Sequence, residues 1–372
     1  MWRRRLRPYN LEPSPARKGA TMKCRRTSLL LTMAMAAGLA APSDACTRAE
    51  YHGRDGLNIT GRTMDWKEPI PASLWILPRG IHHDGLAGPH SAQWTSRYGS
   101  VVVSAFGIAS ADGMNEKGLV ANMLWLPGSK YPEAEHPENR LSISLWVQYF
   151  LDNFATVDEA VRAMREHPVQ VISDRIPGTD IYTTVHLSIS DASGDNAILE
   201  YIERKLIIHH SRDDQVMTNE PEYDQQLALA TYWKEVGGTV FLPGTSRSAD
   251  RFARAAFYIH AIPETGNAVE GVAEVMSLMR NVSVPIGIST PEKPNISNTR
   301  WRVVADQKNL IYYYEAVTTP NTFWVDLKKA DFRAGARVLR LPLEKDEIYS
   351  GDAIKHFHPS TLFPFLPVSP KR

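Results

Sequence analysis

The chain has 372 residues, of which 43% are hydrophobic and 22% charged, with 42 basic residues against 41 acidic ones. That length suffices for one large domain or two average ones, and the composition excludes a disordered or fibrous protein. Nine of the basic and two of the acidic residues fall in residues 1–45, so the remainder has a formal charge of about −6. A mildly acidic chain without a dense basic run excludes nucleic acid as the principal partner.

The first 45 residues have the pattern of a signal peptide. A basic cluster at residues 23–26 precedes an apolar run at 29–41, and the small residues Ser43 and Ala45 lie just before Cys46. The apolar run suits the hydrophobic region of a leader and is too short to span a bilayer. We therefore expect cleavage before Cys46, and a mature chain that forms a single domain over residues 46–372.

Cleavage there predicts an exported protein, periplasmic in a Gram-negative cell or secreted. Met22 opens the leader more naturally than Met1, so residues 1–21 are either a misassigned start or an extended basic region. The pair Arg25 and Arg26 raises a twin-arginine route, although Ser28 stands where that motif prefers phenylalanine. No other stretch is long and apolar enough to predict stable membrane insertion.

Cysteine usage singles out one residue. Cys24 lies in the leader, so Cys46 is the sole thiol of the mature chain and no intrachain disulfide can form. An N-terminal cysteine provides both a nucleophile and, in its α-amine of pKa about 8, a base that can take the thiol proton. Two alternatives stay open: an inert buried thiol, and a lipid anchor on a binding protein, although Ser43 stands where the lipidation signal prefers leucine.

Hydrophobic periodicity predicts strands interrupted by helix pairs. The predicted strands are residues 57–65, 73–77, 100–108, 119–125 after a turn at 113–118, 183–191, 197–208, 300–306, 310–317 and 323–327. The predicted helices are residues 141–154, 248–261, 268–280, and one that Thr156 and Glu159 cap and that runs to Arg165. Runs of antiparallel strands between helix pairs indicate an α+β layered fold. The Pro-rich end from Pro359 is expected to be an ordered or frayed tail.

Arg62 and Asp65 follow Cys46 at about the distance of one hairpin. A returning strand would bring Arg62 to the thiol, where its charge favours the thiolate, and Asp65 to the α-amine, which its carboxylate would orient. On the residues alone, a surface ion pair is the competing interpretation.

Four motifs occur together in chain order. They are the spacing of Cys46 to Arg62 and Asp65, residues 112–119 (Asp-Gly-Met-Asn-Glu-Lys-Gly-Leu), residues 217–221 (Met-Thr-Asn-Glu-Pro), and residues 242–244 (Leu-Pro-Gly) leading to Arg251 and Phe252. Over residues 46–330 the chain thereby resembles the choloylglycine hydrolases, N-terminal nucleophile hydrolases that include penicillin V acylases and conjugated bile salt hydrolases. The resemblance implies a four-layer αββα sandwich and a linear-amide hydrolase without metal or organic cofactor.

The resemblance also implies roles for residues that the sequence alone leaves undistinguished. Cys46 corresponds to the nucleophile, Asp65 to the carboxylate that orients the amine, and Arg62 to the neighbouring cation. Asn219 corresponds to an oxyanion-hole side chain and Arg251 to a second active-site arginine. Without the resemblance, Asn219 would be interpreted as a turn residue and Arg251 as a solvated helix charge.

One position departs from the bile salt hydrolases. Those enzymes typically have asparagine within the motif Leu-Asn-x-Pro-Gly, and this chain has Trp125 there. With Trp66 it would form an aromatic pocket wall, although either tryptophan could be a core residue. The resemblance favours penicillin V or N-acyl homoserine lactones as substrates, with conjugated bile salts as the alternative.

Other catalytic signatures are absent from the sequence, including the zinc motif H-E-x-x-H and the serine motif G-x-S-x-G. His356 and His358 near the C-terminus are interpreted as solvated rather than metal-binding. Only 31 residues separate Asn219 from Arg251, and this chain lacks the long insertion that Gram-positive relatives carry there. The homo-oligomeric state, a dimer or the tetramer of the family, therefore stays open.

Overall fold

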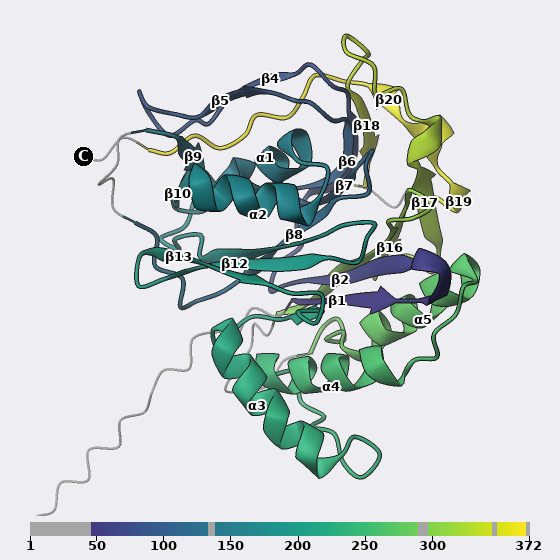
Figure 1. The fold of residues 1–372 in the computed structure, drawn as a ribbon. Coiled ribbons are helices and arrows are strands. Elements are labelled where there is room, and N and C mark those ends of the chain that lie inside the picture. The colour runs from purple at the N-terminus through teal and green to yellow at the C-terminus, as the bar shows by residue number, and fades with distance from the viewer. Residues whose placement is uncertain (1–45, 133–137, 289–296, 344–347, 370–372) are drawn as a thin grey trace, which may run out of the picture. The chain divides into compact units, whose positions relative to one another are not determined.

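Four layers make up the fold in the computed structural model, which describes residues 46–132, 138–288, 297–343 and 348–369. By its internal contacts the chain divides after Ala40, and all of these residues belong to the second unit. Two sheets face each other, with α1 (Trp146–Asn153) and α2 (Val157–Glu166) on one outer face and α4 (Ser248–Ala261) and α5 (Ala268–Asn281) on the other (Figure 1). This arrangement confirms the αββα sandwich. None of the described helices is long and apolar enough to cross a membrane.

The first sheet carries the N-terminal end of the described chain. Its seven strands are, in spatial order, β14 (Val216–Met217), β1 (Thr47–His52), β2 (Asn58–Trp66), β15 (Asn298–Asp306), β16 (Ile311–Ala316), β17 (Thr322–Asp326) and β19 (Gly351–Asp352). All neighbours are antiparallel except β17 and β19. The β1–β2 hairpin places Thr47 opposite Thr63, so Cys46 lies beside the end of β2.

Within the described ranges, the second sheet has nine strands. In spatial order they are β13 (Lys205–His210), β12 (Asn196–Ile202), β11 (Val185–Ser190), β8 (Val120–Trp125), β7 (Ala109–Asn115), β6 (Ser100–Ala105), β3 (Ala72–Leu77), β18 (Leu339–Pro342) and β20 (His358–Pro359). Its side chains alternate between two cores: Leu74 and Ile76 of β3 face the first sheet, whereas Trp75 and Leu77 face α1 and α2. Both faces are therefore covered, which explains why its central strands are buried throughout.

Smaller elements complete the fold. They are two-stranded pairs β4 (His82–Asp84) with β5 (Gln93–Thr95) and β9 (Arg140–Ser142) with β10 (Gln170–Ile172), helix α3 (Tyr223–Val236) against α4, and the 3₁₀ turns η1 (Arg54–Gly56), η2 (Ile143–Leu145), η3 (Leu327–Lys329) and η4 (Ile354–His356).

Several predicted boundaries are wrong for identifiable reasons. The expected turn at 113–118 is shorter, because Gly113 belongs to β7, where a side chain would collide with Val101 O and Leu151. The predicted strand at 197–208 is a hairpin, β12 and β13, whose turn residues Glu203 and Arg204 both have positive φ. Neither residue type predicts such a turn.

The helical prediction needs two further corrections. Within residues 141–154 only α1 is helical, because Ser142 caps the short η2 turn, its side chain accepting from Ser144 N, and delays the helix to Trp146. Helix α3 was not predicted, since only its Tyr223 and Gln226 are buried and no apolar stripe marks it. The Thr156 cap is confirmed, with its hydroxyl accepting from Glu159 N at 3.2 Å.

Candidate active site

Cys46 lies immediately before β1 with only 3% of its surface exposed. Its Sγ is 3.8 Å from Nη2 of Arg62 and 3.5 Å from the backbone N–H of Asp65. Both neighbours come from the returning strand β2, as the hairpin spacing predicted. Burial raises the pKa of the Cys46 thiol to about 11, although Arg62 and Arg251 lower it. Within this chain, where the Cys46 nitrogen is a peptide amide, the thiol is therefore protonated at neutral pH.

Arg62 connects the two sheets. Its side chain is fully buried, and Nη1 lies 2.6 Å from Oδ2 of Asp112 on β7, across the sandwich. Nη2 donates to the carbonyl of Met123 on β8 at 3.0 Å and faces the thiol. The alternative of a surface ion pair with Asp65 is wrong, because the partner of Arg62 is a buried aspartate in the opposite sheet.

Asp65 lies three residues further along β2, so strand alternation turns its side chain to the other face, with Thr63. Thr63 Oγ1 donates to Oδ2 at 3.4 Å, whereas Oδ1 has no hydrogen-bond donor among the described residues. Burial raises the pKa of Asp65 to about 6, although the guanidinium of Arg251 lowers it. The unused oxygen is a ready acceptor close to the nucleophile.

Asn219 is held in one orientation by its neighbours. Its Oδ1 accepts from Cys46 N and from Nη2 of Arg251, each at 2.7 Å, and its Nδ2 donates to the carbonyl of Trp125 at 2.7 Å. Because the first two partners can only donate and the third can only accept, oxygen and nitrogen cannot be exchanged. One Nδ2–H remains beyond the bond to Trp125. Asn219 is fully buried, so its interpretation as an ordinary turn residue is wrong.

Arg251, on α4, fixes the end of β1 from the opposite side. Its Nη1 donates to the carbonyl of Cys46 at 2.5 Å and to Thr47 Oγ1 at 2.6 Å, and its Nε donates to Ser246 O at 2.9 Å. The side chain is fully buried, so the interpretation of a solvated helix charge is also wrong. Thus the five residues for which the resemblance implies a catalytic role lie together, with the other four around Cys46.

A second buried group supports the segment that carries Asn219. His186 on β11 is hydrogen-bonded through Nδ1 to Glu200 Oε1 at 2.9 Å and through Nε2 to the carbonyl of Thr218 at 2.8 Å. Glu200 Oε2 accepts from Tyr223 N at the start of α3. No signal in the sequence marks His186 and Glu200, because isolated His and Glu residues on apolar strands form no recognisable pattern. Asp112 belonged to the motif at residues 112–119, but its pairing with Arg62 was not predicted.

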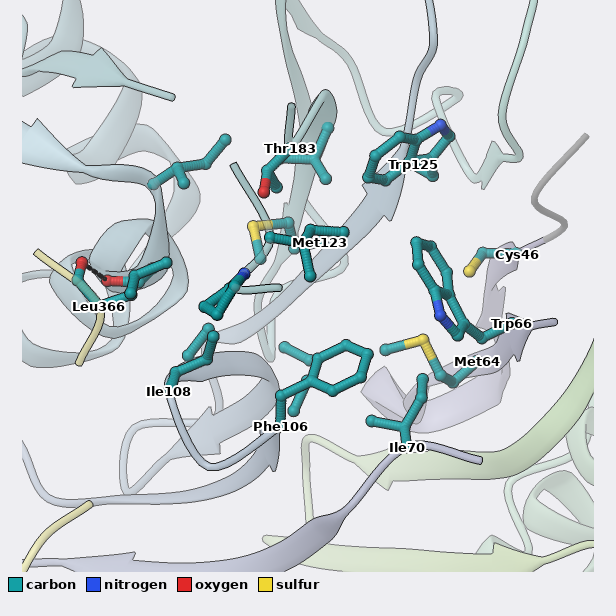
Figure 2. Close-up of a pocket in the computed structure, with 18 of the residues that line it drawn as sticks. Cys46, Met64, Trp66, Ile70, Phe106, Ile108, Met123, Trp125, Thr183 and Leu366 are labelled. Carbon is teal, nitrogen blue, oxygen red and sulfur yellow. Dashed lines mark hydrogen bonds between the residues drawn. The ribbon is translucent and has the colours of Figure 1, made fainter. Parts of the chain in front are cut away.

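An apolar cavity opens beside Cys46 (Figure 2). Trp66 and Trp125 line it, with ring centroids 5.4 Å apart in an edge-to-face contact, and Phe106 meets Trp66 at 6.3 Å. Both tryptophans thus lie in the cavity wall, where a substrate could meet them. Among the described residues that line it, Cys46 and Arg62 carry reactive or charged groups and Ser144 and Thr183 carry hydroxyls. The other described lining residues are apolar, so most of this wall suits an apolar ligand.

The described residues contain no group of three or more His, Cys, Asp or Glu side chains that could hold a metal ion. His356 is at the end of η4 and His358 in β20, which is exposed.

Comparisons with known proteins agree with this geometry. Residues 46–339 match the family of linear amide C–N hydrolases, choloylglycine hydrolase family. A penicillin V acylase from Pectobacterium atrosepticum is 46% identical over 368 residues, covering 92% of this chain and 96% of the relative. A bile salt hydrolase/transferase from Clostridium perfringens is 25% identical over 312 residues, covering 76% and 93%.

Solved structures give the same result. The structure of a penicillin V acylase from Agrobacterium tumefaciens has a TM-score of 0.81 and 50% sequence identity, covering 87% of this chain and 100% of the relative. A conjugated bile acid hydrolase from Clostridium perfringens has a TM-score of 0.69 at 22% identity, covering 82% and 98%, which shows a shared fold.

Proposed function

The chain belongs to the choloylglycine hydrolase family of linear amide C–N hydrolases, and from that premise we propose that it is an N-terminal cysteine acylase of the penicillin V acylase type. The observation that carries the proposal is the position of Cys46. Its Sγ lies at the mouth of an apolar cavity, within 3.8 Å of a buried arginine, while Asn219 holds the nitrogen of the same residue. A thiol, a cation and an amide are thus gathered at one end of an apolar cavity.

In the proposed reaction, the α-amine released by cleavage takes the proton of the Cys46 thiol. The thiolate attacks the amide carbonyl, and the tetrahedral intermediate collapses when the amine passes that proton to the leaving nitrogen. Water then hydrolyses the thioester, and the protein regains its thiol. The free Oδ1 of Asp65 supports this scheme, because an ammonium beside it would supply the donor that the described residues do not.

The oxyanion would be stabilised by Asn219 and a backbone N–H. Asn219 retains one Nδ2–H after donating to Trp125 O. Trp125 of β8 lies opposite Val185 of β11, and the next pair along the two strands is hydrogen-bonded, from Leu126 N to Thr184 O. Because hydrogen-bonded and non-hydrogen-bonded pairs alternate between antiparallel strands, Trp125 and Val185 form a non-hydrogen-bonded pair. The backbone N–H of Trp125 therefore points away from β11, to the side on which Asn219 binds its carbonyl. In other acyl-transfer enzymes one such donor contributes about 3 to 4 kcal/mol.

The lining of the cavity supports the proposed substrate class. Its walls are apolar and include Trp66, Trp125 and Phe106, which suit an aromatic acyl group or a medium-length alkyl chain. Phenoxyacetyl amides such as penicillin V and N-acyl homoserine lactones have such acyl groups on a polar amine. The relatives from Pectobacterium atrosepticum and Agrobacterium tumefaciens, both penicillin V acylases, support the first of these. Conjugated bile salts are the alternative substrates within the family.

We also propose that the chain is exported and that cleavage before Cys46 creates the catalytic terminus. The family match begins at Cys46 and β1 begins at Thr47, which support this boundary. The burial of the thiol argues against the alternative of a lipid anchor, because a diacylglyceryl group needs an exposed sulfur. Intact-mass measurement of the purified mature protein distinguishes the two: the proposal requires Cys46 as an unmodified first residue.

The activity is tested with penicillin V, N-acyl homoserine lactones and glycine-conjugated bile salts, following release of the free acid. We expect cleavage of one or both of the first two classes, and a loss of roughly 10³-fold or more in kcat/KM for a correctly processed Cys46→Ser variant, since an alcohol ionises far less readily than a thiol. Preferential cleavage of bile salts would overturn the proposed substrate class. Full activity of the serine variant would overturn thiolate catalysis.

A further inference from the structure

A segment that lies outside the family match contributes to the wall of the cavity at the end opposite Cys46. Residues 363–369, here called the strap, follow β20, whereas the match ends at residue 339. Leu366 of the strap lines the same cavity as Cys46, and Figure 2 shows the two residues at opposite ends of it. The family match therefore covers the reacting end of the cavity but not this part of its far wall.

Hydrogen bonds fix the backbone of Leu366 on two sides. Its N–H donates to the carbonyl of Ile108 at 2.9 Å, and its carbonyl accepts from the hydroxyls of Ser142 at 2.7 Å and Ser144 at 2.9 Å. Both serines are buried, with 2% and 3% of their surface exposed. Two residues further on, Val368 N donates to Leu86 O at 2.8 Å. A backbone held in this way gives the Leu366 side chain a defined position rather than that of a frayed tail.

We propose that Leu366 is a specificity-determining residue that limits the length of the acyl group. The inference rests on the proposed function, in which the acyl carbonyl must reach Sγ of Cys46. An acyl tail that enters the cavity from that end runs toward Leu366, past Met123. The side chain of Leu366 then meets the tip of the tail, and its size sets how many carbons fit.

The expected effect follows from the selectivity of apolar pockets. One methylene more or less in such a pocket changes kcat/KM by roughly 10-fold or more. Leu366→Ala removes three carbons at the end of the cavity, so longer acyl chains gain room and short ones lose contact. Leu366→Trp fills the same space and excludes the longer chains. The two variants should therefore move the preferred chain length in opposite directions.

The experiment measures kcat/KM for a series of amides of one amine with unbranched acyl chains of increasing length. We expect the optimum to move to longer chains in Leu366→Ala and to shorter chains in Leu366→Trp, with the ratio of longest to shortest substrate changing by about 10-fold or more in each. The matched control is Leu362→Ala, the same change at a half-buried leucine close by that lines a different cavity, with Ser73 and Trp75. The control should keep the wild-type optimum.

The outcomes separate the inference from the proposed function. If the wild-type protein cleaves the series and neither Leu366 variant moves the optimum, the inference is wrong and the proposed function stands. If Leu362→Ala moves the optimum as far as Leu366→Ala, the effect is a general loosening of this segment and the inference is also wrong. If the wild-type protein cleaves no member of the series or of the substrate panel, the proposed function fails and the inference with it. Because the Ala and Trp variants act in opposite senses, one that folds is enough for the test.

Discussion

At the scale of single residues, Asp65 is the group whose charge state should control catalysis. Burial raises its pKa to about 6, although Arg251 lowers it. In the processed enzyme the α-ammonium of Cys46 would lower it further, because a nearby positive charge favours the carboxylate. The carboxylate can orient the amine, whereas the protonated acid has lost that capacity.

We therefore predict that kcat/KM falls as the pH falls through 6 or somewhat below, as Asp65 takes up its proton. Asp65→Asn should lower kcat/KM by roughly 10²-fold or more and remove the inflection near pH 6, whereas a fall that reflects protonation of the α-amine, of ordinary pKa about 8, remains. The measurement is the pH profile of kcat/KM for both proteins. Asp180→Asn, the same change at a carboxylate whose side chain is 97% exposed, is the control and should retain the wild-type profile. An inflection near pH 6 that persists in Asp65→Asn would show that a group other than Asp65 titrates there.

At the scale of the elements, the Arg62–Asp112 ion pair joins β2 to β7 and thus one sheet to the other. Asn122 Nδ2 also donates to Asp112, at 3.1 Å, so the carboxylate is fully enclosed by partners. Removing one member of a buried pair leaves the other charge without compensation, which costs about 3 to 5 kcal/mol.

Asp112→Asn should accordingly lower the free energy of unfolding by about 3 to 5 kcal/mol. Urea denaturation measures this change. The exposed pair of Arg175 and Asp180 offers a comparison, since loss of its carboxylate in Asp180→Asn should cost about 1 kcal/mol or less. Equal losses in the two variants would mean that the bridge between the sheets adds nothing beyond a surface pair.

The turn of the β12–β13 hairpin has a strained backbone. Glu203 and Arg204 form its turn with φ of 44° and 68°, values that disfavour side chains with a Cβ. Glu203→Asn combined with Arg204→Gly should raise the free energy of unfolding by about 0.5 to 1 kcal/mol, because Asn-Gly adopts this turn readily. Thermal or urea unfolding tests the gain, with Arg204→Ala, which keeps the Cβ, as the control. No gain, or equal behaviour of the two, would contradict the strain argument.

At the scale of the whole domain, Glu200 ties several elements together. It accepts from His186 on β11, from Tyr223 N at the start of α3, and lies 3.5 Å from His209 on β13. Burial alone would raise the pKa of Glu200, but the hydrogen bonds from His186 and His209 outweigh it and lower the pKa to about 2. The pKa of His209 is raised in turn, chiefly by its bond to Glu200.

The directions of these two pKa shifts predict the pH range in which Glu200 contributes most to the free energy of unfolding. A lowered carboxyl pKa stabilises the fold above about 4.5, and this stability is lost as the pH falls toward 2. A raised histidine pKa stabilises the fold below about pH 6.5, and this contribution to stability is lost at higher pH. Glu200→Gln should therefore cost most, about 3 kcal/mol, between pH 4.5 and 6.5. Urea unfolding across pH measures this; the exposed Glu264→Gln is the control. A pH-independent difference would refute the linkage.

The fold class could be predicted from the sequence because period-2 and period-3.6 patterns are local properties. Helix α4 was predicted with the correct ends, and β2 and β3 to within one residue. The residues of the active site could be predicted from the sequence only in part. Spacing alone related Arg62 and Asp65 to Cys46, whereas Asn219 and Arg251 rested on resemblance.

What could not be predicted depends on contacts between distant parts of the chain. Asp112 meets Arg62 because two sheets face each other, and Leu366 meets the cavity because the strap crosses β9 and η2. The sequence near Asp112 indicates a turn, and the Pro-rich segment around Leu366 has no periodicity. Local sequence patterns do not show which residues meet across the sandwich.

The burial of Cys46 also predicts how its thiol reacts with alkylating and oxidising reagents. With a pKa of about 11 and a peptide nitrogen, roughly one thiol in ten thousand would be ionised at pH 7, so iodoacetamide or peroxide should modify the uncleaved chain slowly. Once the amine is free, it can take the proton, and the same sulfur becomes reactive. The rate of alkylation would therefore report maturation without any substrate.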